Sequence, residues 1–293
     1  MINTHTCRYV IFFLVVLIMC TRLAFAEDII GQKELWIKID DFESKNPLSD
    51  WTKYDAQNET DPYIKNPQVT EIRVEQLSNN ISSNRYLIKK AGPDGIFGNR
   101  KALSFRKLPK PIEVGDTYTL YLRLNVDSYS NNHVFGLTNL QPAGIMEKAY
   151  EAFEPSIRIT DRFDPHVNYQ NNGAMQVRNN PWYDIAFNAK KGKNIEPFDT
   201  DIWYEIWLVI NNRKKSEGGQ RYDIYIRGGT EFPLQQKVYT AADFRIKREQ
   251  PLIYFQATCN SGPVEEPFGN GGLRYDDLYM VKGIDLSSPV ITK

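Results

Sequence analysis

The sequence predicts an all-β protein, a two-sheet antiparallel jelly-roll sandwich with one short helix. The first observation is the alternation of apolar and polar residues in two runs, 203–210 and 222–226, with a polar loop between them. Alternation with a period of two is typical of strands that bury one face, and the loop indicates that the two runs pair antiparallel. The second is the closing run 273–282, a further strand with two carboxylates in its middle. The other apolar runs are short and separated by Gly, Pro and Asn, as in sandwiches and jelly rolls.

The expected elements follow one another with turns between them. The strongest early strand is 118–126, where Leu120, Leu122 and Leu124 alternate with polar residues. Further strands are expected at 39–43, 69–77, 85–89, 102–105, 133–137, 156–159, 175–178, 182–187 and 252–257. The one helix is expected at 143–153, directly after Pro142. No internal repeat or linker is found, so residues 39–293 are expected to form one domain, preceded by a lead-in at 27–38.

The first residues have the three-part plan of a signal peptide. An arginine-containing start is followed by an unbroken apolar run at 10–20, and Ala24-Phe25-Ala26 is a small-residue cleavage site. The apolar run is too short to span a bilayer comfortably. We therefore expect cleavage after Ala26, no membrane span in the mature chain, and a location outside the cytoplasm: secreted, periplasmic or at the cell surface.

Composition excludes some classes of function. The chain has 36 basic and 36 acidic residues, so nothing in its net charge indicates binding to nucleic acid or to an acidic membrane. Two of the three cysteines lie in the expected signal peptide, which leaves Cys259 alone. An exported protein without a disulfide must be stabilised by its core, and a chain of 293 residues is large enough for that.

Five stretches carry a resemblance to a known family: 40–44, 115–120, 201–212, 222–226 and 275–279. The first reads Asp-Asp-Phe-Glu-Ser and the last Tyr-Asp-Asp-Leu-Tyr. In these stretches the chain resembles the concanavalin A-like (LamG, jelly-roll) superfamily of lectins, glucanases and polysaccharide lyases. It is most similar to exported bacterial proteins that contain one such domain. The resemblance implies a carbohydrate-related role, although one fold hosts many activities.

Basic and aromatic residues on the polar phase of the strands are the candidate binding residues. Arg123, Arg158 and Arg178 fall on three separate expected strands, and Tyr121 lies beside Arg123. If these faces line one concave sheet, they form a cationic groove for an acidic sugar. The alternative is a solvated sheet face with ordinary cross-strand pairs. The candidate ligand-binding set is Tyr121, Arg123, Arg158, Arg178, Trp182 and Gln256.

Tryptophans are candidate platforms for sugar rings. Trp182 is expected in a loop or short strand, and Trp203 and Trp207 share a strand face with Glu205. The alternative is that these rings fill the protein interior, since Trp is usually largely buried. Gln256 lies in the run 254–257, which is similar to the tyrosine-rich late strand of lyases in this superfamily.

Catalysis is the alternative to recognition. A lyase needs a base, for which Tyr121, His133 and His166 are candidates, and a cation such as Arg123 to neutralise a uronate carboxylate. A glycoside hydrolase is disfavoured, because the Glu-x-Asp-x-x-Glu strand of hydrolases with this fold is absent.

The sequence therefore favours a lectin-like domain that binds an extracellular or cell-wall polysaccharide, with an acidic one suggested by the arginines. A lyase acting on a uronate-containing glycan and a structural or adhesion domain without a sugar site remain as alternatives.

Carboxylates at the two ends of the domain are candidate metal ligands. First and last strands commonly pair in this fold, which would bring them together at a structural Ca²⁺. The alternative is edge-strand charges that face water. No cofactor is expected to be required. The candidate ligands are Asp40, Asp41, Glu43, Asp276 and Asp277.

Overall fold

The computed structural model describes residues 35–76, 83–164, 169–262 and 270–290. Contacts divide the chain into Met1–Leu35 and Trp36–Lys293, and the second unit contains every element described below. The expected signal peptide at 1–26 lies outside the described residues. No helix in the described part of the chain is both long enough and apolar enough to cross a membrane.

The fold is the predicted two-sheet antiparallel sandwich, and its larger sheet, sheet A, has eight strands. The expected pair of runs is confirmed: Ile206 lies opposite Ile226 in adjacent antiparallel strands. Sheet A consists, in spatial order, of β17 (Phe232–Asp243), β16 (Arg221–Gly228), β15 (Trp203–Asn211), β6 (Thr117–Ser128), β19 (Gly272–Lys282), β4 (Ser83–Lys90) and β3 (Val69–Gln76), and β1 (Ile37–Asp40) also pairs with β19.

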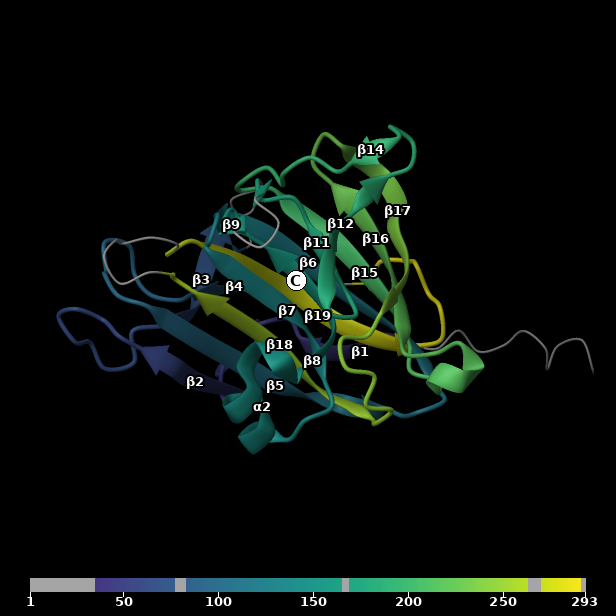
Figure 1. The fold of residues 1–293 in the computed structure, drawn as a ribbon, viewed down its shortest axis with the longest axis horizontal. Helices are drawn as coiled ribbons and strands as arrows, with labels where there is room; N and C mark the ends of the chain where they lie inside the picture. The colour runs from purple at the N-terminus through teal and green to yellow at the C-terminus, as the bar shows by residue number, and fades with distance from the viewer. Residues whose placement is uncertain (1–34, 77–82, 165–168, 263–269, 291–293) are drawn as a thin grey trace, which may run out of the picture. The chain divides into compact units, whose positions relative to one another are not determined.

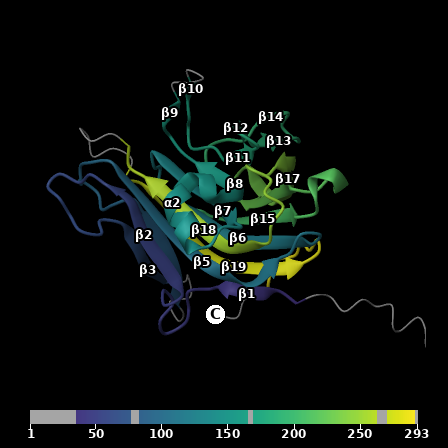
Figure 2. The ribbon, with the colours of Figure 1, turned by 60° about the horizontal axis from the view of Figure 1, so that its bottom comes forward.

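The second sheet, sheet B, has seven strands and packs against sheet A (Figures 1 and 2). It consists, in spatial order, of β12 (Trp182–Ile185), β11 (Gln176–Asn179), β8 (Phe153–Ile159), β7 (Asn132–Thr138), β18 (Leu252–Asn260), β5 (Arg100–Ile112) and β2 (Trp51–Asn58). Two small pairs, β9 (Phe163–Asp164) with β10 (Tyr169–Gln170) and β13 (Phe187–Asn188) with β14 (Lys193–Asn194), lie on the β11–β12 side of the molecule (Figure 2).

The expected helix after Pro142 is confirmed as α2 (Pro142–Lys148), which continues into the 3-10 turn η1 (Ala149–Ala152). Another 3-10 turn, η2 (Lys215–Glu217), lies between β15 and β16. Ile145 of α2 is fully buried against Leu103 and Phe105 of β5. The helix therefore covers one part of the outer face of sheet B, near β18 and β5 (Figure 1).

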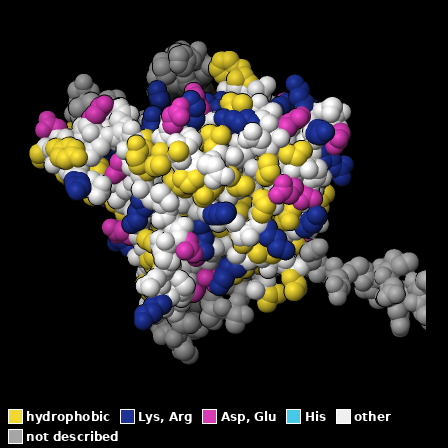
Figure 3. All heavy atoms as spheres, turned by 90° about the horizontal axis from the view of Figure 1, so that it is seen from below, with side chains coloured by type: hydrophobic (Ala, Val, Ile, Leu, Met, Phe, Trp, Pro, Cys, Tyr) yellow, Lys and Arg dark blue, Asp and Glu magenta, His cyan; other side chains and the backbone are white. Residues whose placement is uncertain are grey.

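Apolar side chains from the inner faces of both sheets fill the space between them. Leu120, Leu122 and Leu124 of β6 face this core, together with Phe135 of β7 and Phe255 of β18. The alternation of the sequence thus decides which side of each strand is buried. Outside the core, basic and acidic side chains are interspersed with apolar side chains on the face drawn in Figure 3.

A polar cluster interrupts the apolar core at the end of the sandwich near β3 and β4. The Nζ of Lys89 is fully buried and donates to Gln68 Oε1 at 2.6 Å and to Thr70 Oγ1 at 3.0 Å. Burial lowers the pKa of Lys89 to about 8. Cys259 is buried nearby, and burial raises the pKa of its thiol to about 11, so this lone thiol is poorly disposed to react.

Candidate functional site

Two arginines and a tyrosine lie together on the outer face of sheet B. Gln176 of β11 pairs with Arg158 of β8, and Arg178 of β11 pairs with Tyr183 of β12. Side chains two residues apart on a strand share a face, so these groups lie on one surface. The guanidinium carbons of Arg158 and Arg178 lie 4.0 Å and 4.7 Å from the centroid of the Tyr183 ring. The phenol ring is therefore in contact with two cations.

Arg178 is the least neutralised member of this group. Its side chain is only 7% exposed, it forms no ion pair with any described residue, and no described residue accepts a hydrogen bond from its Nε. Contact with the Tyr183 ring offsets some of the cost of burying this charge, typically about 1–2 kcal/mol. A buried guanidinium without a carboxylate partner is uncommon because desolvation is costly.

A third cation, Arg245, adds positive charge to the same region. Its Nη1 donates to the Tyr150 carbonyl at 2.9 Å, and its Nη2 lies 4.0 Å from the exposed carboxylate of Glu151. Burial, and next the positive charge of Arg178, lower the pKa of Arg245. We call Arg158, Arg178, Tyr183 and Arg245 the arginine cluster. An anion bound there would relieve the mutual repulsion of its cations.

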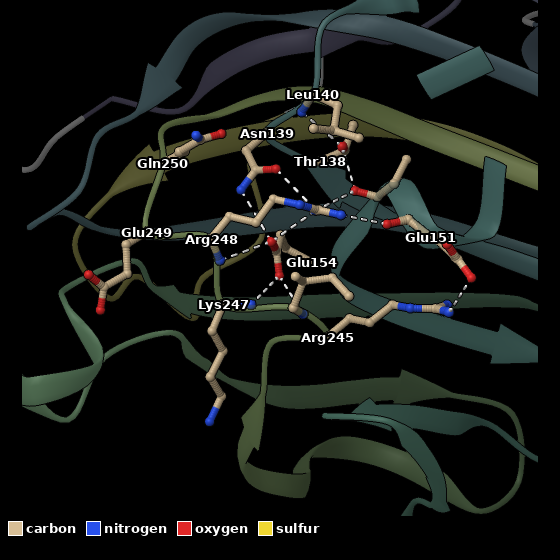
Figure 4. A network of polar contacts seen from close by, with 12 residues as sticks. Thr138, Asn139, Leu140, Glu151, Glu154, Arg245, Lys247, Arg248, Glu249 and Gln250 are labelled. Atoms are coloured by element: carbon tan, nitrogen blue, oxygen red, sulfur yellow. Dashed lines mark hydrogen bonds and ion pairs between the residues drawn. The ribbon is translucent and has the colours of Figure 1, made fainter. Parts of the chain in front are cut away.

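A buried carboxylate fixes the loop that carries Arg245 (Figure 4). Glu154 of β8 is fully buried and accepts hydrogen bonds from the backbone N–H groups of Ile246, Lys247 and Arg248 at 2.9–3.3 Å. The guanidinium of Arg248 also lies 3.0 Å from this carboxylate. Glu154 therefore orders residues 245–248, and Arg245 points to Glu151 (Figure 4).

The single cationic groove expected from the sequence is wrong, because its residues lie on two different sheets. Arg158 and Arg178 lie on sheet B, whereas Tyr121 and Arg123 lie on β6 of sheet A. Arg123 is neutralised by Asp276 at 3.4 Å and Asp277 at 3.2 Å. Both polar phases face outward, but on opposite sides of the sandwich.

Tyr121 is buried rather than available to a ligand. Its side chain is 1% exposed, packs against Trp36 and Trp207, and donates to Glu205 Oε1 at 2.9 Å. Burial, and then the negative charge of Glu205, raise the pKa of Tyr121. A covered phenol with a raised pKa is unsuited to act as a general base.

His133, one of the two histidine candidates, does not join the arginine cluster. His133 lies on the inner face of sheet B, is fully buried, and forms a 2.9 Å hydrogen bond through Nε2 with the Tyr275 hydroxyl. Burial lowers its pKa well below the usual value. His133 therefore faces the core, while Arg158 of the neighbouring strand faces outward. His166 lies outside the described residues.

The remaining candidates have mainly structural contacts. Gln256 is fully buried and donates to the Ala149 carbonyl at 3.0 Å, which holds η1 on the sheet. Trp207 is fully covered, and the Trp203 ring is enclosed between Tyr86 and Arg123. Trp182 is 69% exposed, but it alternates with Tyr183 along β12 and so faces away from the arginine cluster.

Sequence reasoning missed Tyr183 and Arg245. Tyr183 follows Trp182 directly, and the strand pairing with Arg178 is what selects it. Arg245 lies outside any strand, between β17 and β18, so no periodicity marks it.

The expected pairing of the first and last strands is confirmed, since Asp40 of β1 lies opposite Leu278 of β19. It does not create an open cation site. Among the described residues, no group of three acidic, His or Cys side chains is arranged to hold a metal ion. The candidate carboxylates instead accept from protein donors: Asp40 from Trp51, Phe42 and Arg106, Asp41 from Lys38, Glu43 from the Arg85 N–H, and Asp276 and Asp277 from Arg123.

The water-facing alternative is wrong for the last two carboxylates. Asp276 and Asp277 are fully buried, and β19 is a central strand of sheet A. Asp277 has φ 51°, in the left-handed region, at an irregularity of the pairing between Asp276 and Tyr279. This bulge lets two adjacent carboxylates reach the same guanidinium.

We expect that removing divalent cations with a chelator leaves the melting temperature unchanged, because Lys38, Arg106 and Arg123 already pair with four of the five candidate carboxylates. Thermal unfolding followed by circular dichroism, with and without chelator, measures this. A lower melting temperature that added Ca²⁺ restores would contradict it.

No family model matches the sequence, and no curated protein matches it. Similar solved structures include the VIP36 exoplasmic/lumenal domain in a Ca²⁺/Man3GlcNAc-bound form, at 8% identity and TM-score 0.45 over 87% of this chain and 92% of that one. The Emp47p carbohydrate recognition domain is 7% identical at TM-score 0.40, over 84% and 95% of the two chains. The marine PL-14 alginate lyase from Aplysia kurodai is 15% identical at TM-score 0.42, over 72% and 87%. Similarity at these scores carries no argument about function.

Proposed function

We propose that the protein is an exported domain that binds an acidic polysaccharide at the arginine cluster of sheet B. The observation that carries this proposal is Arg178, a buried cation in contact with Tyr183 and without a carboxylate partner among the described residues. Because a buried guanidinium without a carboxylate partner is costly, an anionic ligand would stabilise it. The expected signal peptide supports a location where polysaccharides are met.

The chemistry of the cluster fits the carboxylate or sulfate group of a glycan. Guanidinium groups bind such anions through two parallel hydrogen bonds, which lysine cannot reproduce. Arg158 and Arg178 are held by the same Tyr183 ring, so little side-chain entropy is lost on binding. The fixed loop at 245–248 contributes a third cation from the side.

Replacing Arg178 by Met is expected to weaken binding of acidic polysaccharides by about tenfold or more, because a charged hydrogen bond contributes roughly 1.5–3 kcal/mol. Methionine retains much of the apolar stem against Tyr183. Affinity electrophoresis of the mature chain in gels containing acidic or neutral polysaccharides measures the effect. Arg73→Met, at an exposed ion pair on sheet A, is the matched control and is expected to bind like the wild type.

Retardation by neutral polysaccharides alone, or equal retardation of Arg178→Met and the wild type, would contradict the proposal. The melting temperature of each variant, measured in parallel, separates loss of binding from loss of folding.

A polysaccharide lyase is the second candidate, and one observation favours it: a phenol, Tyr183, lies between two arginines. A lyase needs a base beside a cation that neutralises the substrate carboxylate, and a phenol next to guanidinium groups provides that pair. Incubation with uronate-containing glycans, followed by the ultraviolet absorbance of new unsaturated ends, tests it. Product formation that Tyr183→Phe abolishes would replace the binding role by catalysis. If neither retardation nor product were observed, a structural or adhesion domain without a sugar site would be favoured.

A further inference from the structure

A cavity of about 530 Å³ lies at the edge of the sandwich, far along the sheets from the arginine cluster. It lies where the edge strand β2 of sheet B meets the edge strand β3 of sheet A. The two strands are joined there by Lys53 Nζ, which donates to the Thr70 carbonyl at 3.1 Å, and by Gln68, which donates to Asp55 at 2.8 Å. The lining residues are Lys53, Tyr54, Asp55, Asn58, Tyr63, Asn66 and Gln68.

Gln68 has one fixed orientation on the inner side of this cavity. Its Oε1 accepts from the buried ammonium of Lys89 at 2.6 Å and from Thr70 Oγ1 at 2.8 Å. An ammonium can only donate, so the amide oxygen must face Lys89 and the amide NH₂ must face Asp55. The Gln68 side chain therefore presents donors, not acceptors, on the cavity side.

Asp55 is the acceptor beside those donors. Its Oδ1 accepts from Gln68, and no described residue donates to its Oδ2. Burial raises the pKa of Asp55, because desolvation disfavours the charged form of its carboxyl group. A ligand hydroxyl could donate to Oδ2 and accept from the second N–H of Gln68.

The outer wall of the cavity is a loop closed by its own hydrogen bonds. Asn58 Nδ2 donates to the Ile64 carbonyl at 2.8 Å, and the Ile64 N–H donates to Thr60 Oγ1 at 2.8 Å. Gly98 packs so closely on this loop that a Cβ there would lie 1.9 Å from the Glu59 carbonyl oxygen. The wall is thus preorganised, which lowers the entropy lost on binding.

Two aromatic rings border the cavity and remain open to solvent. Tyr63 is 72% exposed and Tyr54 is 40% exposed. Exposed tyrosine rings beside fixed polar groups suit a ligand with one apolar face and a rim of hydroxyls. The lining contains one cation, Lys53, and one anion, Asp55, so its formal charge is zero.

We propose that this cavity binds a residue of a neutral sugar, with the ring against Tyr63 and hydroxyl groups bonded to Asp55 and Gln68. The site goes beyond the proposed function and does not depend on it, because it shares no residue with the arginine cluster. It differs from that cluster in charge, and it therefore selects an uncharged ligand.

Isothermal titration of the mature chain with neutral gluco-, galacto-, manno- and N-acetylglucosamine oligosaccharides tests the proposal. We expect saturable binding of at least one of them, weakened about tenfold or more by Tyr63→Ala and by Asp55→Asn. Phe187→Ala removes an exposed aromatic ring from β13 and is the matched control, expected to bind like the wild type. Arg178→Met is also expected to leave this binding unchanged, which separates the cavity from the arginine cluster.

Two results would overturn the proposal. One is the absence of saturable binding for every neutral oligosaccharide of the panel. The other is binding that Tyr63→Ala and Asp55→Asn both leave intact. Because Tyr63 is largely exposed, its replacement does not endanger the fold, and the melting temperature of the variant verifies this.

Discussion

Replacing Glu154 by Gln is expected to lower the free energy of unfolding by about 3 kcal/mol or more, since removing one partner of a buried charge network typically costs that much. The carboxylate is fully buried and accepts from three consecutive backbone N–H groups of the loop at 246–248. The amide of Gln would turn one NH₂ group toward these donors. It would also leave Arg248 without its anion. Urea unfolding followed by Trp fluorescence measures the change.

Glu151→Gln is the matched control, because the Glu151 side chain is 66% exposed and its nearest cation lies 4.0 Å away. Exposed pairs of this kind contribute about 0–1 kcal/mol. Equal destabilisation by the two substitutions would show that the buried network in Figure 4 contributes nothing special to stability. The loop would then be held by its other contacts, and the place of Arg245 in the arginine cluster would need revision.

Replacing Lys89 by Met is expected to abolish a rise of about 3 kcal/mol in the free energy of unfolding between about pH 8 and 10.5. Burial lowers the pKa of Lys89 from 10.5 to about 8, so the folded protein holds a charge that its interior disfavours. That difference corresponds to about 3 kcal/mol, and at neutral pH it is offset by the hydrogen bonds of the charged ammonium to Gln68 and Thr70, which contribute roughly 1.5–3 kcal/mol each. Methionine has a similar length and carries no charge.

The pH dependence of the free energy of unfolding shows whether the buried charge of Lys89 is the cause of this effect. Between pH about 8 and 10.5 the unfolded chain keeps the Lys89 proton and the folded chain loses it. The unfolded state then binds more protons, so the stability of the wild type rises with pH through this window. Lys89→Met should lack that rise. Urea unfolding across the window measures the rise in both proteins, and the exposed Lys110→Met is the control. A parallel rise in Lys89→Met and the wild type would contradict the assignment.

The strand pattern could be predicted because burial acts on every second residue. The alternation of Leu120, Leu122 and Leu124 indicates a strand and its buried face. The alternation of Ile206 and Leu208 does so for another strand. The helix after Pro142 was predictable from proline chemistry. In each case a local rule agrees with the tertiary structure.

The site was less predictable, because alternation identifies the outward side of a strand but not the sheet to which the strand belongs. Arg123 and Arg158 both occupy polar positions, yet they lie on opposite outer faces of the sandwich. Alternation also fails to predict the bulge at Asp277, because the left-handed backbone there buries two adjacent carboxylates. Tyr183 becomes part of the cluster only through its register with Arg178.

The central position of β19 in sheet A has a consequence for the order of events during synthesis and folding. This late strand lies between β6 and β4 and also pairs with β1, so it joins parts of the chain made much earlier. Until β19 has left the ribosome, sheet A consists of three separate pieces with exposed hydrogen-bonding edges: the group from β17 to β6, the pair β4 and β3, and the lone strand β1. Closing such distant contacts makes folding slow, and it leaves the growing chain open to aggregation or to chaperones for the whole of its synthesis.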